Sequence, residues 1–439
     1  MTRFKRILKK TAKTLVALVL VVFLANSLLN YYWGRQIEAR LAAIRAAGQP
    51  VSLADMQGPS VPEHENAALL YRQAFKIMSE PSVERDMNTV SLILSSTART
   101  PSPADWAKAK SALVRCGGIL ALIEEAQSKP ACQFSAYPVI KGMSQESLRR
   151  YEALSQEHYK QLVGLRNATR LLCAEVIFSA REGKTQDVVS YTQSALNVSD
   201  AIRGNATLVD YLVNVAIINV VLANMRQALS YCRPSESELR QLDSALSRIN
   251  APELYKHAIE GERVYFLTQN YEFRKAGIGS IPLSSGDTVS YLDFISRHLE
   301  CTRMNYSAAL SKGLVGPHAA DKVPFYAILT KITAPVTVMA AGARYKCEAE
   351  IACGRIFLAL RAYKARFGKY PRTLNDLRSG VDWKLPTDPF TGKDMVYKQA
   401  GDGFILYSVG YDLKDNGGTA LQLNGEAEPT GDIVWRTAR

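Results

Sequence analysis

A run of apolar residues near the N-terminus constrains this chain more than any other feature. Residues 14–29 are almost wholly apolar, and the aromatic cluster Tyr31-Tyr32-Trp33 follows. About 20 residues from Thr14 to Trp33 form roughly 30 Å of helix, which matches the hydrocarbon core of a bilayer. We therefore predict one transmembrane helix over residues 14–33.

The charges that flank this segment predict its orientation. No acidic residue precedes Thr14, whereas six basic residues do: Arg3, Lys5, Arg6, Lys9, Lys10 and Lys13. Basic flanks stay in the cytoplasm, and aromatic rings favour a membrane interface. We predict a cytoplasmic segment over residues 1–13 and a single pass through a bacterial inner membrane. The bulk of the chain would then lie in the periplasm or outside.

A cleaved signal peptide is the alternative to a retained anchor. The triplet Ala25-Asn26-Ser27 offers small residues to a peptidase, but apolar Leu28 and Leu29 follow at once. The aromatic cluster stands where a retained helix would leave the membrane. The pattern therefore favours the anchor.

The net charge of +13 suggests nucleic-acid binding until the charges are located. Six of them lie in the first thirteen residues, which leaves +7 for the rest of the chain. Beyond residue 13 no run of Lys and Arg is interleaved with aromatic residues. We interpret the excess as a topology signal and expect no nucleic-acid partner.

Seven cysteines are present, and none forms a Cys-x-x-Cys motif, which argues against zinc-ribbon and thioredoxin-type chemistry. Outside the cytoplasm some of them could pair, and Cys116 and Cys132 are the nearest candidates. The alternative is that the cysteines are small buried apolar residues on helices.

Residues 36–276 predict a domain built from helices that stack as hairpins. Gly183 lies in the break after a long helix over residues 145–181, and Ser235 with Glu238 forms a capping box. Residues 208–229 are the most apolar internal segment, interrupted by Asp210, Asn214, Asn219 and Asn224. We predict a buried core helix there, not a second membrane span.

Residues 277–338 are less regular and predict a linker between two domains, with a lid as the alternative. A helix ending at Phe367 then opens a smaller α+β domain over residues 339–439. Two alternating segments, 395–399 and 404–409, flank Gly401-Asp402-Gly403 and predict a β-hairpin.

The order of motifs in the last hundred residues resembles the globular part of the major pseudopilin of type II secretion systems. The motifs are Gly368-Lys369-Tyr370-Pro371, Leu385-Pro386-Thr387-Asp388-Pro389, Tyr407-Ser408-Val409-Gly410-Tyr411-Asp412, Gly417-Gly418 and Asp432-Ile433-Val434-Trp435. The resemblance implies a long helix packed on a small antiparallel sheet, with Ca²⁺ holding the last loop. The whole chain also resembles uncharacterised membrane-anchored proteins of planctomycete-type bacteria, a resemblance that carries no known activity.

Four residues are candidate calcium ligands. Asp412 and Asp432 match motif positions of the pseudopilins, and Asp415 and Asn416 are added because the same loop contains them. Calcium takes six to eight oxygen ligands, which such a loop can supply. The alternative is a turn that its own Asx side chains cap without an ion. The span from Gly418 to Asp432 is longer than in the family.

No catalytic residue is predicted. Hydrolase, nucleotide-binding and His-Glu-x-x-His motifs are absent from the sequence, and we interpret Glu63-His64-Glu65 as an ordinary helix start. No processed Gly-Phe-Thr-x-x-x-Glu-like segment precedes Thr14, so we expect a tether and not a filament stem.

Three hypotheses of function remain. The first is a non-enzymatic envelope protein that binds a partner and carries a calcium-stabilised module. The second is a component or adaptor of a type II secretion-like apparatus, which rests on analogy of fold alone. The third is an envelope enzyme with an unrecognised site in the helical domain. The expected partners are the membrane and envelope or secretion-system proteins.

Overall fold

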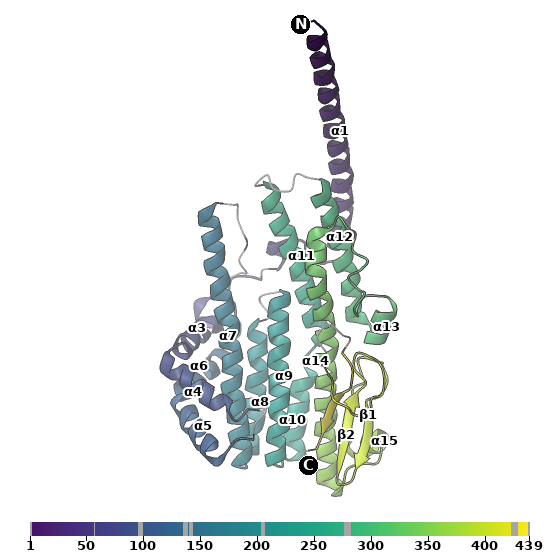
Figure 1. Ribbon diagram of the computed structural model, residues 1–439. Coiled ribbons are helices and arrows are strands. Elements are labelled where there is room, and N and C mark those ends of the chain that lie inside the picture. The colour runs from purple at the N-terminus through teal and green to yellow at the C-terminus, as the bar shows by residue number, and fades with distance from the viewer. Residues whose placement is uncertain are drawn as a thin grey trace.

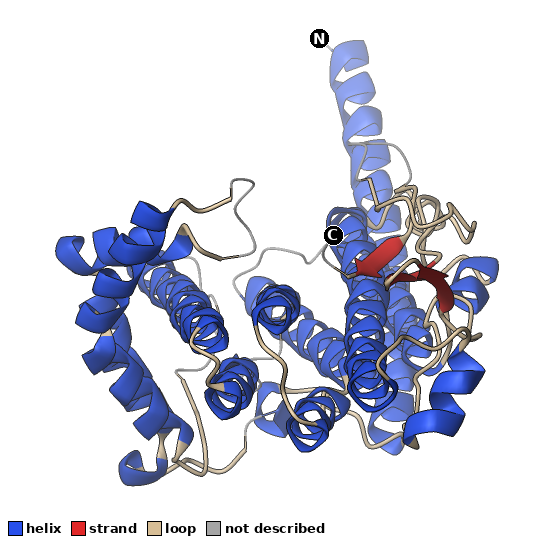
Figure 2. Cartoon of the chain, turned by 90° about the horizontal axis from the view of Figure 1, so that it is seen from below, coloured by secondary structure: helices blue, strands red, loops and turns tan. Residues whose placement is uncertain are grey.

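The computed structural model describes residues 2–56, 58–94, 100–134, 139, 144–202, 207–275, 282–422 and 429–437. The protein is mainly helical and carries one small antiparallel sheet near the C-terminus, as predicted. A single long helix extends from one end of an elongated body, and the C-terminus lies toward the other end (Figure 1). Seen from below, most helices of the body point toward the viewer and the sheet lies to one side (Figure 2).

Helix α1 covers Thr2–Ala46 without a break. Its first part extends away from the body, and its last part packs against α12 (Figure 1). The helix ends where Gly48, at a φ of +69°, precedes Gln49 and Pro50. Because the helix continues through Gly34, the predicted anchor over residues 14–33 and the start of the predicted helical domain at residue 36 form one element.

After α2 (Leu53–Met56), which contacts α11, and η1 (Glu63–Glu65), four helices form a small group beside α7: α3 (Ala67–Met78), α4 (Pro81–Ser91), α5 (Pro103–Arg115) and α6 (Gly117–Gln127). Asn66 caps α3, since its side chain accepts a hydrogen bond from the Ala68 N–H. Helices α5 and α6 are separated at Cys116, which ends α5 and precedes Gly117-Gly118 at the start of α6.

The centre of the body is a set of longer helices: α7 (Gln145–Arg181), α8 (Thr185–Asn197), η2 (Val198–Ile202), α9 (Leu208–Tyr231) and α10 (Glu236–Ser247). The break at Gly183 is as predicted, because this glycine adopts a φ of +75°. The Ser235 capping box with Glu238 is also confirmed. Helix α9 packs against α7, α8, α11 and α14, so it lies inside the body.

The next elements are α11 (Ala251–Lys275), α12 (Pro282–Glu300), η3 (Cys301–Arg303) and α13 (Tyr306–Ser311). We predicted a less regular linker over residues 277–338. That prediction is wrong for residues 282–300, which form five turns of helix. Pro282 occupies the first helical position, where a proline loses no hydrogen bond and its fixed φ suits the helix.

Helix α14 covers Ile328–Phe367 and connects the helical part of the body to the sheet. It packs against α9, α10, α11 and α12, and also against two of the strands. Its end is as predicted, because Gly368 adopts a left-handed φ of +74°. Its start is eleven residues earlier than the predicted Met339.

The C-terminal unit adds α15 (Leu374–Val381) and three strands, β1 (Val396–Ala400), β2 (Gly403–Ser408) and β3 (Ile433–Arg436). The strands are antiparallel in the order β1-β2-β3, and the predicted hairpin is confirmed. Phe357 of α14 packs against Phe404 and Trp435 of the sheet, with ring centroids 6.0 and 5.5 Å apart.

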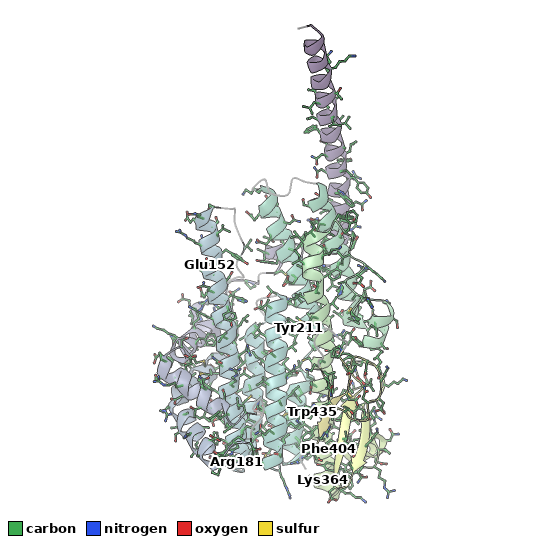
Figure 3. All side chains as sticks on the ribbon, in the orientation of Figure 1. Glu152, Arg181, Tyr211, Lys364, Phe404 and Trp435 are labelled. Carbon is green, nitrogen blue, oxygen red and sulfur yellow. The ribbon has the colours of Figure 1, made fainter. Side chains whose placement is uncertain are left out.

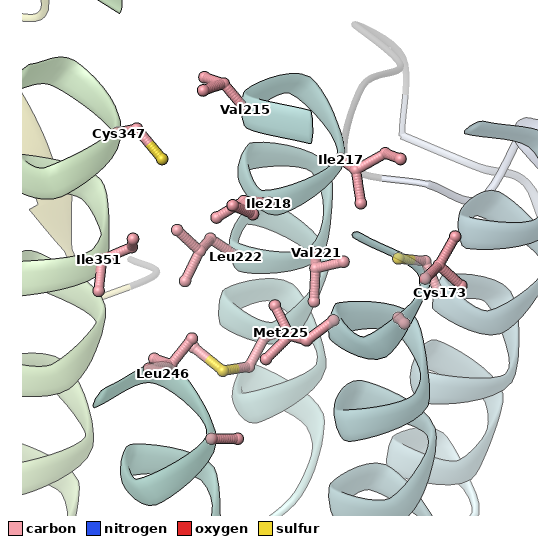
Figure 4. Packing of buried hydrophobic residues seen from close by; sticks show 14 of the residues in the cluster. Cys173, Val215, Ile217, Ile218, Val221, Leu222, Met225, Leu246, Cys347 and Ile351 are labelled. Atoms are coloured by element: carbon pink, nitrogen blue, oxygen red, sulfur yellow. The ribbon is translucent and has the colours of Figure 1, made fainter. Parts of the chain in front are cut away.

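A continuous apolar core joins the helical array to the C-terminal unit. Figure 4 shows Ile218 and Leu222 of α9 on the side of the helix that faces Cys347 and Ile351 of α14. All seven cysteines are free thiols, and only Cys132 is not fully buried. The structure therefore favours buried apolar cysteines over the Cys116–Cys132 pair.

Candidate functional site

The loop between β2 and β3 brings three of the four candidate calcium ligands together. The side-chain amide of Asn416 donates to both carboxylate oxygens of Asp412, at 3.3 and 3.0 Å. The backbone N–H of Asn416 donates to Oδ1 of Asp432 at 3.3 Å. Asn416 therefore lies between the two aspartates that the motif singled out.

Asp432 is the buried member of this group. The Gly418 N–H donates to its Oδ2 at 2.7 Å, so both carboxylate oxygens accept hydrogen bonds from the main chain. Burial raises the pKa of Asp432, the nearby charges of Asp415 and Asp412 add to the rise, and the two backbone N–H groups oppose it. These two hydrogen bonds therefore hold the loop against Asp432, directly before β3.

Asp415 lies apart from the other three. Its Oδ1 accepts hydrogen bonds from the Tyr407 hydroxyl at 2.6 Å and from the Gly417 N–H at 2.8 Å. The bond from Tyr407 is the main reason that the pKa of Asp415 is lowered. Lys398 lies 3.8 Å away on β1. This carboxylate is directed toward the sheet surface and not toward Asp432.

The loop in this form holds itself together through its own donors. Within the described part of the chain, no group of three or more His, Cys, Asp or Glu residues has the geometry to hold a metal ion. A calcium ion needs oxygen ligands. The loop would fit one only if the Asn416 amide turned to present its oxygen in place of Nδ2. The span also includes Glu426 and Glu428, which lie outside the described residues.

The other acid–histidine groups form no shared site. Glu63-His64-Glu65 is a short 3₁₀ helix in which the exposed His64 ring lies 3.5 Å from Glu65. In the buried part of the array, Nε2 of His158 lies 2.8 Å from Oδ1 of Asp210. This contact joins α7 to the capped start of α9 and does not border the cleft described next.

A basic cleft opens between α9, α14 and the free side of β3. Its volume is about 1360 Å³. It lies toward the end of the body opposite the free part of α1, where Figure 3 labels Lys364, Phe404 and Trp435. Its lining includes one acidic residue, Asp402, and five basic residues: Arg226, Arg233, Arg361, Lys364 and Arg436.

Three elements supply these cations. Arg226 lies on α9 and Arg233 just beyond its end. Arg361 and Lys364 are one helical turn apart on α14, so they lie on the same face. Arg436 is the last residue of β3. The packing of β3 against α14 therefore concentrates charges that are more than two hundred residues apart in sequence.

The cleft cations bond to main-chain oxygens, not to carboxylates. Four of them donate to carbonyl oxygens: Arg226 to Val434 (3.4 Å), Arg361 to Cys232 (2.9 Å), Lys364 to Asp402 (3.3 Å) and Arg436 to Gly418 (3.0 Å). Among the residues that the structure describes, none of the five lies within 4.0 Å of a carboxylate oxygen. Their charges are therefore fixed in place but not neutralised.

Aromatic rings support two of these cations. The Arg226 guanidinium lies 5.1 Å from the centre of the Trp435 ring, and the Lys364 ammonium lies 4.5 Å from that of Tyr370. The buried Trp435 is itself held by a hydrogen bond from Nε1 to Glu350, at 2.7 Å. A smaller cavity of about 310 Å³ shares Ala223 and Arg226 with the cleft. This arrangement suits an anionic ligand.

Sequence reasoning missed the cleft because its cations form no run in the sequence. The excess charge was interpreted as a topology signal, and the +7 beyond residue 13 forms no run of Lys and Arg interleaved with aromatic residues. The only available signal was the pairing of Arg361 and Lys364 at a spacing of three. That spacing is common on exposed helix faces, so it did not point to a site.

Comparisons with models of known protein families, with curated proteins and with solved structures find no match for this chain. The pseudopilin resemblance therefore remains a prediction from the motifs.

Proposed function

We propose that this chain is a membrane-anchored extracytoplasmic protein that acts by binding other proteins, not by catalysis. The observation that carries the proposal is the division of α1 into two parts. The most apolar 18-residue window of its candidate span is 0% buried, whereas Ile37 and Ile44 further along pack against Val289 and Leu292 of α12. One rigid helix thus joins a bare apolar segment to the body.

The contacts where α1 meets the body support a membrane boundary there. The Trp33 ring lies 6.3 Å from that of Tyr326, and Tyr31 and Tyr32 are exposed beside it. Phe325 is 86% exposed and Ile328 is 64% exposed, so exposed apolar side chains lie near the place where α1 meets the body. Aromatic and apolar residues at such a place favour contact with the headgroup region.

The position of the basic cleft supports an interaction role. Lys364 lies 36 residues along α14 from Ile328, or roughly 50 Å of helix. The cleft therefore lies far from the proposed membrane surface. A partner in the envelope would reach it there. The six basic residues before Thr14 place the opposite end in the cytoplasm under the positive-inside rule.

A labelling experiment tests the anchor and its orientation. Lys10→Cys and Lys369→Cys are introduced separately into the full chain, and a membrane-impermeant maleimide is added to intact spheroplasts. We expect labelling at residue 369 alone, retention in the carbonate-washed membrane pellet, and little labelling of the parent protein, whose thiols are nearly all buried. A soluble product that begins after residue 27 would overturn the anchor in favour of a cleaved signal peptide.

A role in a secretion-like apparatus is the second candidate. The three-stranded antiparallel sheet packed on the end of a long helix is the arrangement that the pseudopilin resemblance implies. Chemical cross-linking of the full chain in its native membrane, followed by identification of the linked proteins, tests this role. Recovery of secretion-system proteins would support it, and recovery of unrelated envelope proteins alone would contradict it.

Calcium binding to the loop between β2 and β3 is part of the same proposal. The convergence of Asp412, Asn416 and Asp432 favours it. The test compares thermal unfolding with and without calcium for the parent and for an Asp412→Ala, Asp432→Ala variant. Asp415→Asn tests the fourth candidate ligand separately, because Asp415 accepts its hydrogen bonds from Tyr407 and Gly417. An equal calcium response in the parent and the double variant would eliminate the site.

A further inference from the structure

Strand β3 lines the basic cleft with a free edge. Among the residues that the structure describes, it pairs with β2 on one side only, because the order of the sheet is β1-β2-β3. The Thr437 N–H donates to the Phe404 carbonyl oxygen at 3.4 Å, so this pair is hydrogen-bonded across the two strands. Antiparallel pairing alternates, which directs the main-chain groups of Val434 and Arg436 away from β2. A strand edge that pairs with no other strand can accept an added strand.

The contacts at the two ends of β3 determine the length of the edge that is open to another strand. The Val434 carbonyl oxygen accepts its hydrogen bond from Arg226 in the cleft, as the alternation requires. At the start of the strand the edge is closed, because the Leu421 N–H donates to the Asp432 carbonyl oxygen at 2.8 Å. The open part spans residues 434–437, or roughly 13 Å of extended chain.

We propose that the cleft binds an extended acidic segment of a partner protein, which adds to β3 as a fourth strand. The inference rests on the proposed interaction role and names the chemistry of the partner. Main-chain pairing with β3 would supply affinity, and acidic side chains would meet the unpaired cations. In particular, Arg233 and Arg436 are exposed and lie at the same cleft.

The geometry favours a peptide over other anions. A single phosphate fills only a small part of a cleft of about 1360 Å³ whose cations come from three separate elements. A nucleic acid would satisfy the cations but has no main chain to pair with Val434 and Arg436. An acidic strand satisfies both the edge and the charges.

The binding test uses the full chain in nanodiscs and a fluorescent ten-residue peptide of alternating Glu and Val. We expect saturable binding that weakens at least tenfold for an Arg233→Glu, Arg436→Glu variant and weakens as salt rises. Because Arg436 also donates to Gly418, the single Arg233→Glu variant should show a smaller loss without that bond being disturbed. Lys369→Glu is the matched control, since this exposed lysine lies outside the cleft and should leave binding unchanged.

Two further ligands separate strand addition from simple charge attraction. The same peptide with alternate amides N-methylated keeps its charge but cannot pair along one edge, so we expect at least a tenfold loss. A single-stranded oligonucleotide of equal charge should bind more weakly than the parent peptide. Equal binding of the methylated peptide or of the oligonucleotide would overturn the proposal, and so would an absence of peptide binding at 1 mM. If cross-linking on membranes still captures partner proteins in that case, the interaction role stands and only this partner chemistry fails.

Discussion

Helices α1 and α9 are both long and apolar enough to cross a membrane, yet they occupy opposite environments. The most apolar window of α1 is 0% buried, and that of α9 is 61% buried inside the body. Their similar hydropathy therefore does not determine where they lie. The position of their polar residues does, because a polar group on a core helix needs a partner from a neighbouring element.

The polar residues of α9 find such partners in the body. The Asn214 side chain donates to the Ser199 carbonyl oxygen at 3.0 Å, and Oδ1 of Asp210 lies 2.8 Å from Nε2 of His158 on α7. The apolar part of α1 instead satisfies its hydroxyls within the helix, since Ser27 donates to the Phe23 carbonyl oxygen four residues earlier. A helix whose polar side chains form hydrogen bonds within the helix can lie in lipid. The buried polar side chains of α9 instead need partners on neighbouring elements.

Removing a large side chain should give the greatest contrast between the two helices. Leu222→Ala on α9 should lower the free energy of unfolding by about 3 kcal/mol, because it leaves a cavity between α9 and α14. Leu20→Ala on α1 should leave it unchanged, since Leu20 is 55% exposed and touches no core. Denaturant unfolding followed by tryptophan fluorescence in nanodiscs measures both. A similar loss for the two variants would break the comparison.

The next effect is a pH dependence of stability that arises in α12. This helix packs against α1 on one face and borders the core on the other. Burial lowers the pKa of His298 to about 4 from its ordinary value of 6.5. Between these pH values the unfolded chain takes up a proton that the folded protein does not, so stability falls as the pH falls. The loss should reach about 3 kcal/mol at pH 4.

A comparison of stability against pH for the parent and a His298→Gln variant isolates this contribution. The difference between the two curves should vary between pH 6.5 and pH 4 and be constant above that window. Parallel curves throughout would show that His298 does not titrate differently in the folded protein.

Replacing a polar residue of α9 should give a smaller effect. Asn214→Leu removes the donor to the Ser199 carbonyl oxygen and leaves that buried acceptor without it. We expect a loss of about 1–2 kcal/mol, although the variant makes α9 more apolar. Chemical denaturation gives the value. A gain in stability would mean that apolar packing, and not the hydrogen bond, decides where α9 lies.

The smallest effect should come from the ion pair between α1 and the body. Nε and Nη2 of Arg40 lie 2.7 and 2.8 Å from the two carboxylate oxygens of Asp293. Both side chains are partly exposed, so Arg40→Ala should lower the free energy of unfolding by less than about 1 kcal/mol. A double-mutant cycle with Asp293→Ala measures the coupling energy. A value of several kcal/mol would show that this pair, and not apolar packing, docks α1.

Local signals in the sequence predicted much of the fold. The bounds of α7, the capping box at Ser235 and the end of α14 at Gly368 each follow from residues within a few positions of the feature. In the candidate loop, the motif predicted that Asp412 and Asp432 converge, and the structure places Asn416 between them. The direction of Asp415 depends on Tyr407, which lies eight residues away, and was not predictable from the motif.

Helix α12 shows why some local signals were misinterpreted. Pro282 and Gly286 indicated a loop, but the glycine has a tertiary cause. A Cβ at residue 286 would lie 3.2 Å from the Tyr326 ring and 3.4 Å from the Trp33 ring. The glycine therefore allows α1 and the segment just before α14 to approach α12 closely, a reason that no local pattern contains.

The sequence by itself determined a basic N-terminus, an apolar helix long enough to cross a membrane, and a helical array followed by a small sheet. These features depend on periodicity, capping and charge within short segments. The polar residues within 208–229 predicted that this helix is buried, but only the tertiary structure decided which helices enclose α9 and that the basic cleft exists. Its cations belong to α9, α14 and β3, and they meet because these elements share one core. A charge pattern of this kind is visible only after the chain has folded.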